Sequence, residues 1–228
     1  LLQKGAGPEK DSAGIGRWGL MGWGALGWNG NDGPNSLCAW SRMQLGWGRL
    51  VEIGREREEM RLREVGREGE IYRIPLGPDE SFLLEHRRRS SSYYDRHLPG
   101  EGLLIWHADL RGVDLECADG RWLDAGYPLG ERADAEEGGD NLDFWAHDAE
   151  YTRLHAGNLG DGTDPFDGMQ YRAFTAETNP ASFTESGRHS VRIEEIQIDG
   201  ELAIAQVQTA PPLIEVDEIE VRDGDRDG

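Results

Sequence analysis

The chain lacks an excess of positive charge. Of its 228 residues, 24 are Lys or Arg and 44 are Asp or Glu, so the formal net charge at pH 7 is −20. Nucleic acids and anionic membrane surfaces are bound by basic faces. The composition therefore excludes both as expected partners. An acidic surface is typical of a soluble protein, and calcium binding is the functional alternative, because calcium prefers clustered oxygen ligands.

Long apolar runs and cysteines are also scarce. No run approaches the roughly 18 apolar residues of a transmembrane helix, so we expect no membrane insertion. No leader sequence is visible. The two cysteines, Cys38 and Cys117, lie far apart, and their spacing leaves a disulfide and two free buried thiols equally open.

Complete catalytic motifs are missing as well. The zinc-binding pattern HExxH does not occur, nor does the GxSxG pattern of serine hydrolases. Neither cysteine has a neighbourhood that would activate its thiol. The six histidines form no i, i+4 pair and no short ligand spacing: His86, His97, His107, His147, His155 and His189. The sequence therefore predicts neither nucleophilic catalysis nor a self-contained zinc site.

The most informative stretch that is present is GIGRWGLMGWGALGW, Gly14–Trp28. Its six glycines alternate with large apolar side chains, among them Trp18 and Met21. Glycine at this density allows tight turns and close backbone approach, while Trp and Met are costly to leave in water. We therefore predict a buried, irregular turn that packs under a site, with Met21 at its centre.

This stretch begins a series of motifs that resembles a known family. GIGRWGLMGWG, followed by a short helix ending QLGW, is similar to secreted zinc metallopeptidases of the immune inhibitor A type. The resemblance runs from about Gly14 to Val207, and the shared order of its motifs makes it specific. The further motifs are SFLLEHR (Ser81–Arg87), LPGEGLLIWHAD (Leu98–Asp109), VDLECADG (Val113–Gly120), NLGDGTDPFDG (Asn158–Gly168) and TNPAS (Thr178–Ser182).

The resemblance implies a secreted endopeptidase that acts on protein or peptide substrates. In such enzymes a zinc ion held by three side chains polarises the scissile carbonyl and lowers the pKa of a water that the HExxH glutamate activates. Met21 would lie in the turn below the zinc. Because HExxH is absent, we expect the zinc ligands and the N-terminal half of the peptidase domain upstream of Leu1. The chain by itself is therefore predicted to be inactive.

The fold class implied is α+β and β-rich, the C-terminal part of a zincin-like peptidase domain. A short helix should follow the methionine turn, and antiparallel strands and long acidic loops should follow the helix. We assign residues 1–210 to this domain and 211–228 to an acidic linker. The linker ends DGDRDG, the first half of a calcium loop, which fits either an acidic tail or the start of a calcium-binding module.

Local patterns predict the elements in more detail. A helix over Leu37–Leu45 would be capped by Asn35 or Ser36 and ended by Gly46. The charged run Arg55–Glu68 has helical propensity, but glycines bracket it, and we favour an exposed hairpin strand. Further strands are expected at Leu50–Ile53, Glu70–Leu76, Ser81–Arg87, Gly102–Asp109, Ser190–Ile198 and Glu201–Val207. Gly102–Asp109 should be buried on both faces, and Asp199-Gly200 indicates a tight hairpin between the last two strands.

His107 ends the most apolar strand. A lone histidine at a strand end is usually a hydrogen-bonded structural residue. The sharper alternative places it behind the zinc ligands or beside the substrate. Ile105 and His107 should point to one face of the strand and Trp106 to the other.

Acidic residues cluster in the second half of the chain. Asp114–Tyr151 is predicted to be a long acidic loop, and DGTDPFDG follows it. Carboxylates held close together repel one another unless a cation intervenes. We therefore consider a structural calcium site built from Asp161 and Asp164 with Asp114 or Glu116. The alternative is a solvated acidic loop.

A non-catalytic binding module is the rival function. A glycine-rich β domain could use Trp23, Trp28 and Trp47 to stack on sugars or peptides. Exposed Trp side chains would favour this interpretation, whereas Trp packed under a cavity would favour the peptidase.

Overall fold

The computed structural model describes residues 14–54, 57–119, 149, 159–184, 186–187 and 189–209. In this part of the chain the fold is α+β and β-rich, with few helices and two sheets. The 3₁₀ turns are η1 (Gly16–Trp18), η2 (Trp23–Leu26) and η3 (Tyr93–Asp95), and the helices are α1 (Ala39–Leu45) and α2 (Val65–Glu68). The strands are β1 (Arg49–Glu52), β2 (Arg57–Arg63), β3 (Glu70–Pro75), β4 (Ser81–Arg87), β5 (Gly102–Ala108), β6 (Val113–Leu115), β7 (Val191–Asp199) and β8 (Leu202–Thr209).

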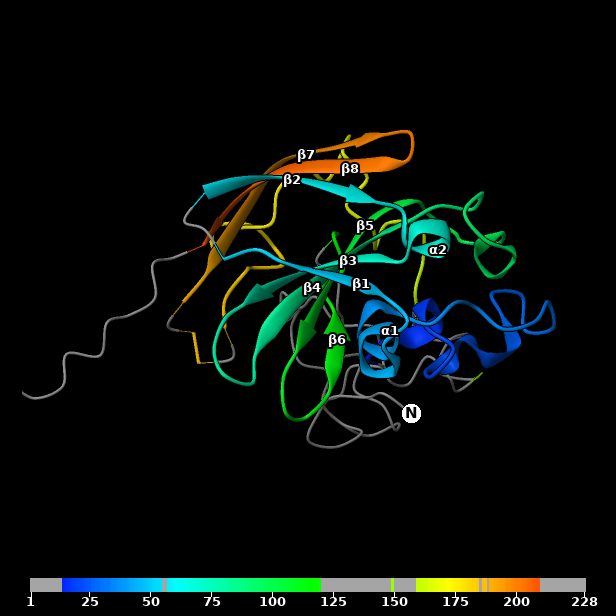
Figure 1. Ribbon diagram of the computed structural model, residues 1–228. Helices are drawn as coiled ribbons and strands as arrows, with labels where there is room; N and C mark the ends of the chain where they lie inside the picture. The colour runs from blue at the N-terminus through cyan, green and yellow to red at the C-terminus, as the bar shows by residue number, and fades with distance from the viewer. Residues whose placement is uncertain are drawn as a thin grey trace, which may run out of the picture.

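A five-stranded sheet forms the middle layer. Its order is β1-β3-β4-β5-β6, with β1 parallel to β3 and the other pairs antiparallel. A three-stranded sheet, β2-β8-β7, covers one of its faces, and α1 with the glycine-rich segment covers the other (Figure 1). Every residue of β4 and β5 is buried, which confirms the prediction for the Gly102–Asp109 strand.

Alternation along the central strands divides the core in two. Leu83 of β4 and Trp106 of β5 pack toward the glycine-rich segment. Phe82 and Ile105 pack toward the three-stranded sheet. This is the expected result for period-2 side chains in a strand that is covered on both sides.

Within the charged run Arg55–Glu68, Arg57–Arg63 form a strand, as predicted, but Val65–Glu68 form the helix α2, and the strand does not form a local hairpin. β2 pairs along its whole length with β8, from Arg57 opposite Gln208 to Arg63 opposite Leu202. Met60 and Leu62 are fully buried beneath it, while its charged side chains face outward. Burial of this alternating apolar pair outweighs the helical propensity of the Arg and Glu residues.

The helix begins later than predicted. α1 starts at Ala39, and Cys38 occupies its N-cap position without a side-chain hydrogen bond that caps the helix. The expected capping residues have other partners: Asn35 Nδ2 donates to the Arg17 carbonyl at 2.6 Å, and Ser36 Oγ donates to Asp95 at 3.0 Å. Gly46 ends the helix in the left-handed conformation, with φ +67°, as predicted.

Two other expectations were resolved. β7 and β8 form the predicted hairpin at Asp199-Gly200, although β7 is irregular between Glu194 and Gln197. Cys38 and Cys117 are both buried free thiols, so they do not form a disulfide. No helix among the described residues is long and apolar enough to cross a membrane.

The acidic loop begins later in the chain than predicted. Asp114 lies in β6, because Val113 and Leu115 are buried at the sheet edge and extend it by one strand. Residues 120–148 and the proposed linker, 211–228, lie outside the described residues.

A buried guanidinium connects the glycine-rich segment to the sheet. Nη1 of Arg87 lies 2.7 Å from Asp95 Oδ1 and Nη2 lies 3.0 Å from Glu85 Oε1, and all three side chains are fully buried. Nη2 also donates to the carbonyls of Leu37, at 2.9 Å, and Trp18, at 3.2 Å. Burial raises the pKa of Glu85, and the adjacent Arg87 opposes that rise.

We expect Arg87→Met to lower the free energy of unfolding by about 3–5 kcal/mol, because it leaves two buried carboxylates without their counter-ion. Urea denaturation of the 228-residue chain measures this loss. Arg61→Met is the matched control, since Arg61 is an exposed arginine on β2, and it should change stability by about 0.5 kcal/mol or less. Equal effects of the two substitutions would contradict the structural role of Arg87.

Candidate functional site

The glycine-rich segment folds into two short 3₁₀ turns, η1 and η2, packed on the sheet. A Cβ atom on Gly22 would lie 2.5 Å from the Gly16 carbonyl oxygen. One on Gly24 would lie 2.7 Å from the Gly19 carbonyl oxygen. Backbone atoms cannot move aside as a flexible side chain can, so this compact turn requires glycine at both positions.

Hydrogen bonds from distant parts of the chain immobilise the turn. Arg17 N donates to the Leu159 carbonyl at 2.8 Å, and Trp18 Nε1 donates to Asp164 Oδ2 at 2.6 Å. Trp18 is fully buried. Together with the bond from Arg87 to the Trp18 carbonyl, these contacts hold an irregular segment in one conformation.

Met21 is not buried, contrary to our expectation. Its side chain is 50% exposed. Only the inner side of so tight a turn can face the sheet, and Trp18 occupies that side, so Met21 lies on the outer side. Its place below a zinc ion stays a prediction.

The three tryptophans of the binding-module alternative differ in exposure. Trp23 and Trp28 are partly buried against the core. Trp47, between α1 and β1, is 66% exposed. Of these three, only Trp47 offers a largely open ring to a ligand.

His107, at the end of β5, lies between two carboxylates. Its Nε2 is 2.7 Å from Glu80 Oε1, and its Nδ1 is 3.2 Å from Glu116 Oε1. Phe82 packs on the ring, with centroids 4.7 Å apart. An imidazole can donate to both carboxylates only when both of its nitrogens are protonated. These contacts favour the structural interpretation of His107, and Ile105 and His107 share a face as predicted.

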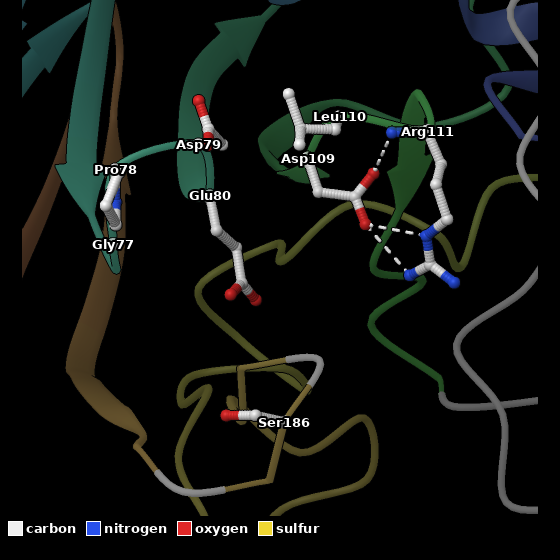
Figure 2. Close-up of a pocket in the computed structure, with 8 residues that line it drawn as sticks. All are labelled: Gly77, Pro78, Asp79, Glu80, Asp109, Leu110, Arg111 and Ser186. Atoms are coloured by element: carbon white, nitrogen blue, oxygen red, sulfur yellow. Dashed lines mark hydrogen bonds and ion pairs between the residues drawn. The ribbon is translucent and has the colours of Figure 1, made fainter.

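A hollow of about 530 Å³ lies beside this cluster. Figure 2 shows the Glu80 side chain reaching into the space between its own turn and the loop that carries Ser186. On the far wall, Asp109 accepts from Arg111 Nε at 3.0 Å and from Nη2 at 2.8 Å. Glu80 therefore lines the hollow, whereas His107 and Glu116 lie behind Glu80 and do not line it.

Asp164 is the second buried acid that the sequence singled out. Its Oδ2 accepts hydrogen bonds from Trp18 Nε1 and from the Asp161 amide, at 2.6 and 2.7 Å. Burial, with a smaller contribution from the charge of Asp161, raises the pKa of Asp164 to about 7. Asp161 itself accepts from the amide and the hydroxyl of Thr163, both at 2.7 Å.

The residues proposed for calcium have different contacts in the structure. Asp161 and Asp164 are neighbours, whereas Glu116 contacts His107, and Asp114 lies opposite His107 across β5 and β6. No group of three or more His, Cys, Asp or Glu side chains in the described part of the chain is arranged to hold a metal ion. Calcium binding therefore stays a prediction, and it would need ligands beyond this pair.

Two residues of these clusters had no signal in the sequence. Glu80 falls between the strands predicted at Glu70–Leu76 and Ser81–Arg87, and Arg87 is the last residue of the second of these. Glu80 is 27 positions from His107, and Arg87 is 69 positions from Trp18. No local pattern reports contacts over such distances in the chain.

The raised pKa of Asp164 predicts a pH dependence of stability. The folded state holds this proton more tightly than the unfolded state, so the contribution is complete below about pH 3.8 and is lost as the pH rises through about 7. In EDTA, the free energy of unfolding relative to Asp164→Asn should fall by about 2–3 kcal/mol between about pH 5 and 8. Parallel curves for the two proteins would contradict this.

The same pair of proteins tests the calcium prediction. A calcium site would raise the melting temperature of the unmodified chain at pH 8 in millimolar calcium relative to EDTA, and Asp164→Asn would remove that shift. No shift in the unmodified chain would reject the site.

His107→Ala should lower the free energy of unfolding by about 2–4 kcal/mol, since it removes an imidazole that faces two carboxylates in a largely buried cluster. The control is His97→Ala, because His97 is far more exposed, and it should change stability little. Thermal denaturation measures both. If His107→Ala were as mild as the control, the structural role would be wrong.

Comparison with known proteins does not assign the chain to a family. No family model, no curated protein and no solved structure matches it.

Proposed function

We propose that this chain is part of the catalytic domain of a secreted zinc-dependent endopeptidase, and that the glycine-rich turn supports the zinc site from below. The observation that carries the proposal is the display of Met21 on an immobilised turn. Gly22 and Gly24 close the turn, and Trp18 ties it to the sheet, while half of the Met21 side chain stays open. A rigid support of this kind is what a preorganised site requires.

The neighbouring surface is consistent with a covering segment. Leu26, four residues after Gly22, is 65% exposed on the same turn. Large apolar side chains left in water on one short segment are typical of a surface that another part of a protein covers. In this proposal the N-terminal half of the peptidase domain provides that cover.

The described residues do not fit a zinc site by themselves. Across the described ranges, the His, Cys, Asp and Glu side chains form no group of three that could hold the metal. We therefore assign no step of peptide hydrolysis to these residues. The ligands and the general base belong to the zinc-binding helix that the family resemblance implies, and this chain alone is proposed to be inactive.

The test compares casein hydrolysis by the protein from its complete reading frame with that by the 228-residue chain. We expect hydrolysis by the complete protein that a zinc chelator abolishes, and none by the chain alone. Chelator-sensitive hydrolysis by the chain alone, or its absence from the complete protein, would overturn the proposal.

A pair of substitutions tests the role of Met21. Met21→Ala should lower the activity of the complete protein several-fold, whereas Met21→Leu, which keeps an apolar side chain of similar volume, should retain most of it. In the chain alone, both should change the free energy of unfolding by about 1 kcal/mol or less, because the side chain is half-exposed there. Full activity of Met21→Ala would remove Met21 from the site.

A further inference from the structure

A second hollow, of about 440 Å³, lies next to the glycine-rich turn. We call it the aromatic hollow. Its lining includes Arg42 of α1, the aromatic residues Trp47, Tyr93 and Tyr94, and the apolar residues Leu20 and Leu37. Small-ligand sites in proteins commonly have about this volume and this mixture of apolar surface with a few polar groups.

Arg42 brings a cation to this hollow, and among the described residues no carboxylate contacts it directly, although the charges of Glu85 and Asp95 act on it from farther away. Its Nε donates to the Leu37 carbonyl at 3.0 Å. Within the described residues its two terminal nitrogens have no hydrogen-bond partner and no carboxylate at ion-pair distance. Burial, and then the charge of Arg87, lower the pKa of Arg42, so the environment disfavours an uncompensated charge. An anion beside the terminal nitrogens would relieve that cost.

Asp95, the acid that contacts the serine residues of the hollow, already has partners in the core. Ser36 and Ser92 line the hollow, and both donate to the buried carboxylate of Asp95, at 3.0 and 2.8 Å. Asp95 also pairs with Arg87. The charge of Asp95 opposes the lowering of the pKa of Arg42 by burial, but Asp95 does not pair with the terminal nitrogens of Arg42, so these nitrogens can contact a ligand.

Three aromatic side chains line the hollow together with Arg42. The Arg96 guanidinium lies 3.7 Å from the centre of the Tyr93 ring, and Tyr94 packs edge-on against Tyr93 at 5.7 Å. Tyr93, Tyr94 and Trp47 are 67%, 51% and 66% exposed. Rings held in place before binding lose little entropy when an apolar group packs on them.

We propose that the aromatic hollow binds the C-terminal carboxylate of a peptide whose last residue is apolar. Arg42 pairs with the carboxylate, and Trp47, Tyr93 and Tyr94 contact the last side chain. A terminal residue carries both groups on one Cα, so a single residue can fill a hollow of this size and reach both partners. The contacts come entirely from this chain and need no zinc, so the proposal is independent of the peptidase function.

Isothermal titration of the 228-residue chain tests the proposal with three peptides. These are acetyl-Gly-Leu-Phe with a free carboxylate, the same peptide as its C-terminal amide, and acetyl-Asp-Leu-Phe amide. The free acid should bind about tenfold or more tightly than either amide, since only it places a carboxylate beside its last side chain. Absence of binding at millimolar peptide, or equal binding of the acid and either amide, would overturn the assignment.

Four variants separate the contributions. Arg42→Gln should abolish the preference for the acid, whereas Arg61→Gln, on the exposed side of β2, should keep it. Trp47→Ala should weaken the acid and the amide by the same factor. Arg42→Lys keeps a cation and should retain part of the preference, which provides a second test if Arg42→Gln does not fold. An unchanged preference in Arg42→Gln would refute the pairing, and none of these results bears on casein hydrolysis.

Discussion

The buried guanidinium of Arg87 is the interaction on which the arrangement of this protein depends. A buried charge is costly unless ions and hydrogen bonds surround it. Here the two carboxylates come from β4 and η3, and two carbonyl groups come from the glycine-rich segment and from Leu37, two residues before α1. An irregular segment makes few ladder hydrogen bonds of its own. Satisfying the charge of Arg87 supplies the long-range contacts that hold it against the sheet.

The two faces of the five-stranded middle sheet are covered in different ways. On one side the three-stranded sheet closes an apolar core by ordinary alternation of side chains. On the other side a compact turn is packed so tightly that glycine is required, and its outer surface carries Met21. The proposed metal-supporting role and the aromatic hollow both belong to this second side, where loops are held by buried polar contacts rather than by strand pairing.

Buried carboxylates in this acidic chain are accommodated in three ways. Asp95 is paired with a guanidinium, Glu116 faces an imidazole, and Asp164 has a pKa raised to about 7 by burial. Burial favours the neutral form of Asp164 below about pH 7.

Much of the secondary structure followed from the sequence alone. The doubly buried strand β5, the hairpin of β7 and β8, the strand β4 and the glycine that ends α1 all depend on the period of apolar residues or on one backbone conformation, and both are local properties. Tertiary structure alone decided that β2 pairs with β8, that Met21 faces outward, that Glu80 and Glu116 meet at His107, and that Arg87 is buried rather than exposed. These features arise from which faces meet after the chain has folded, and residues far apart in the sequence determine that together.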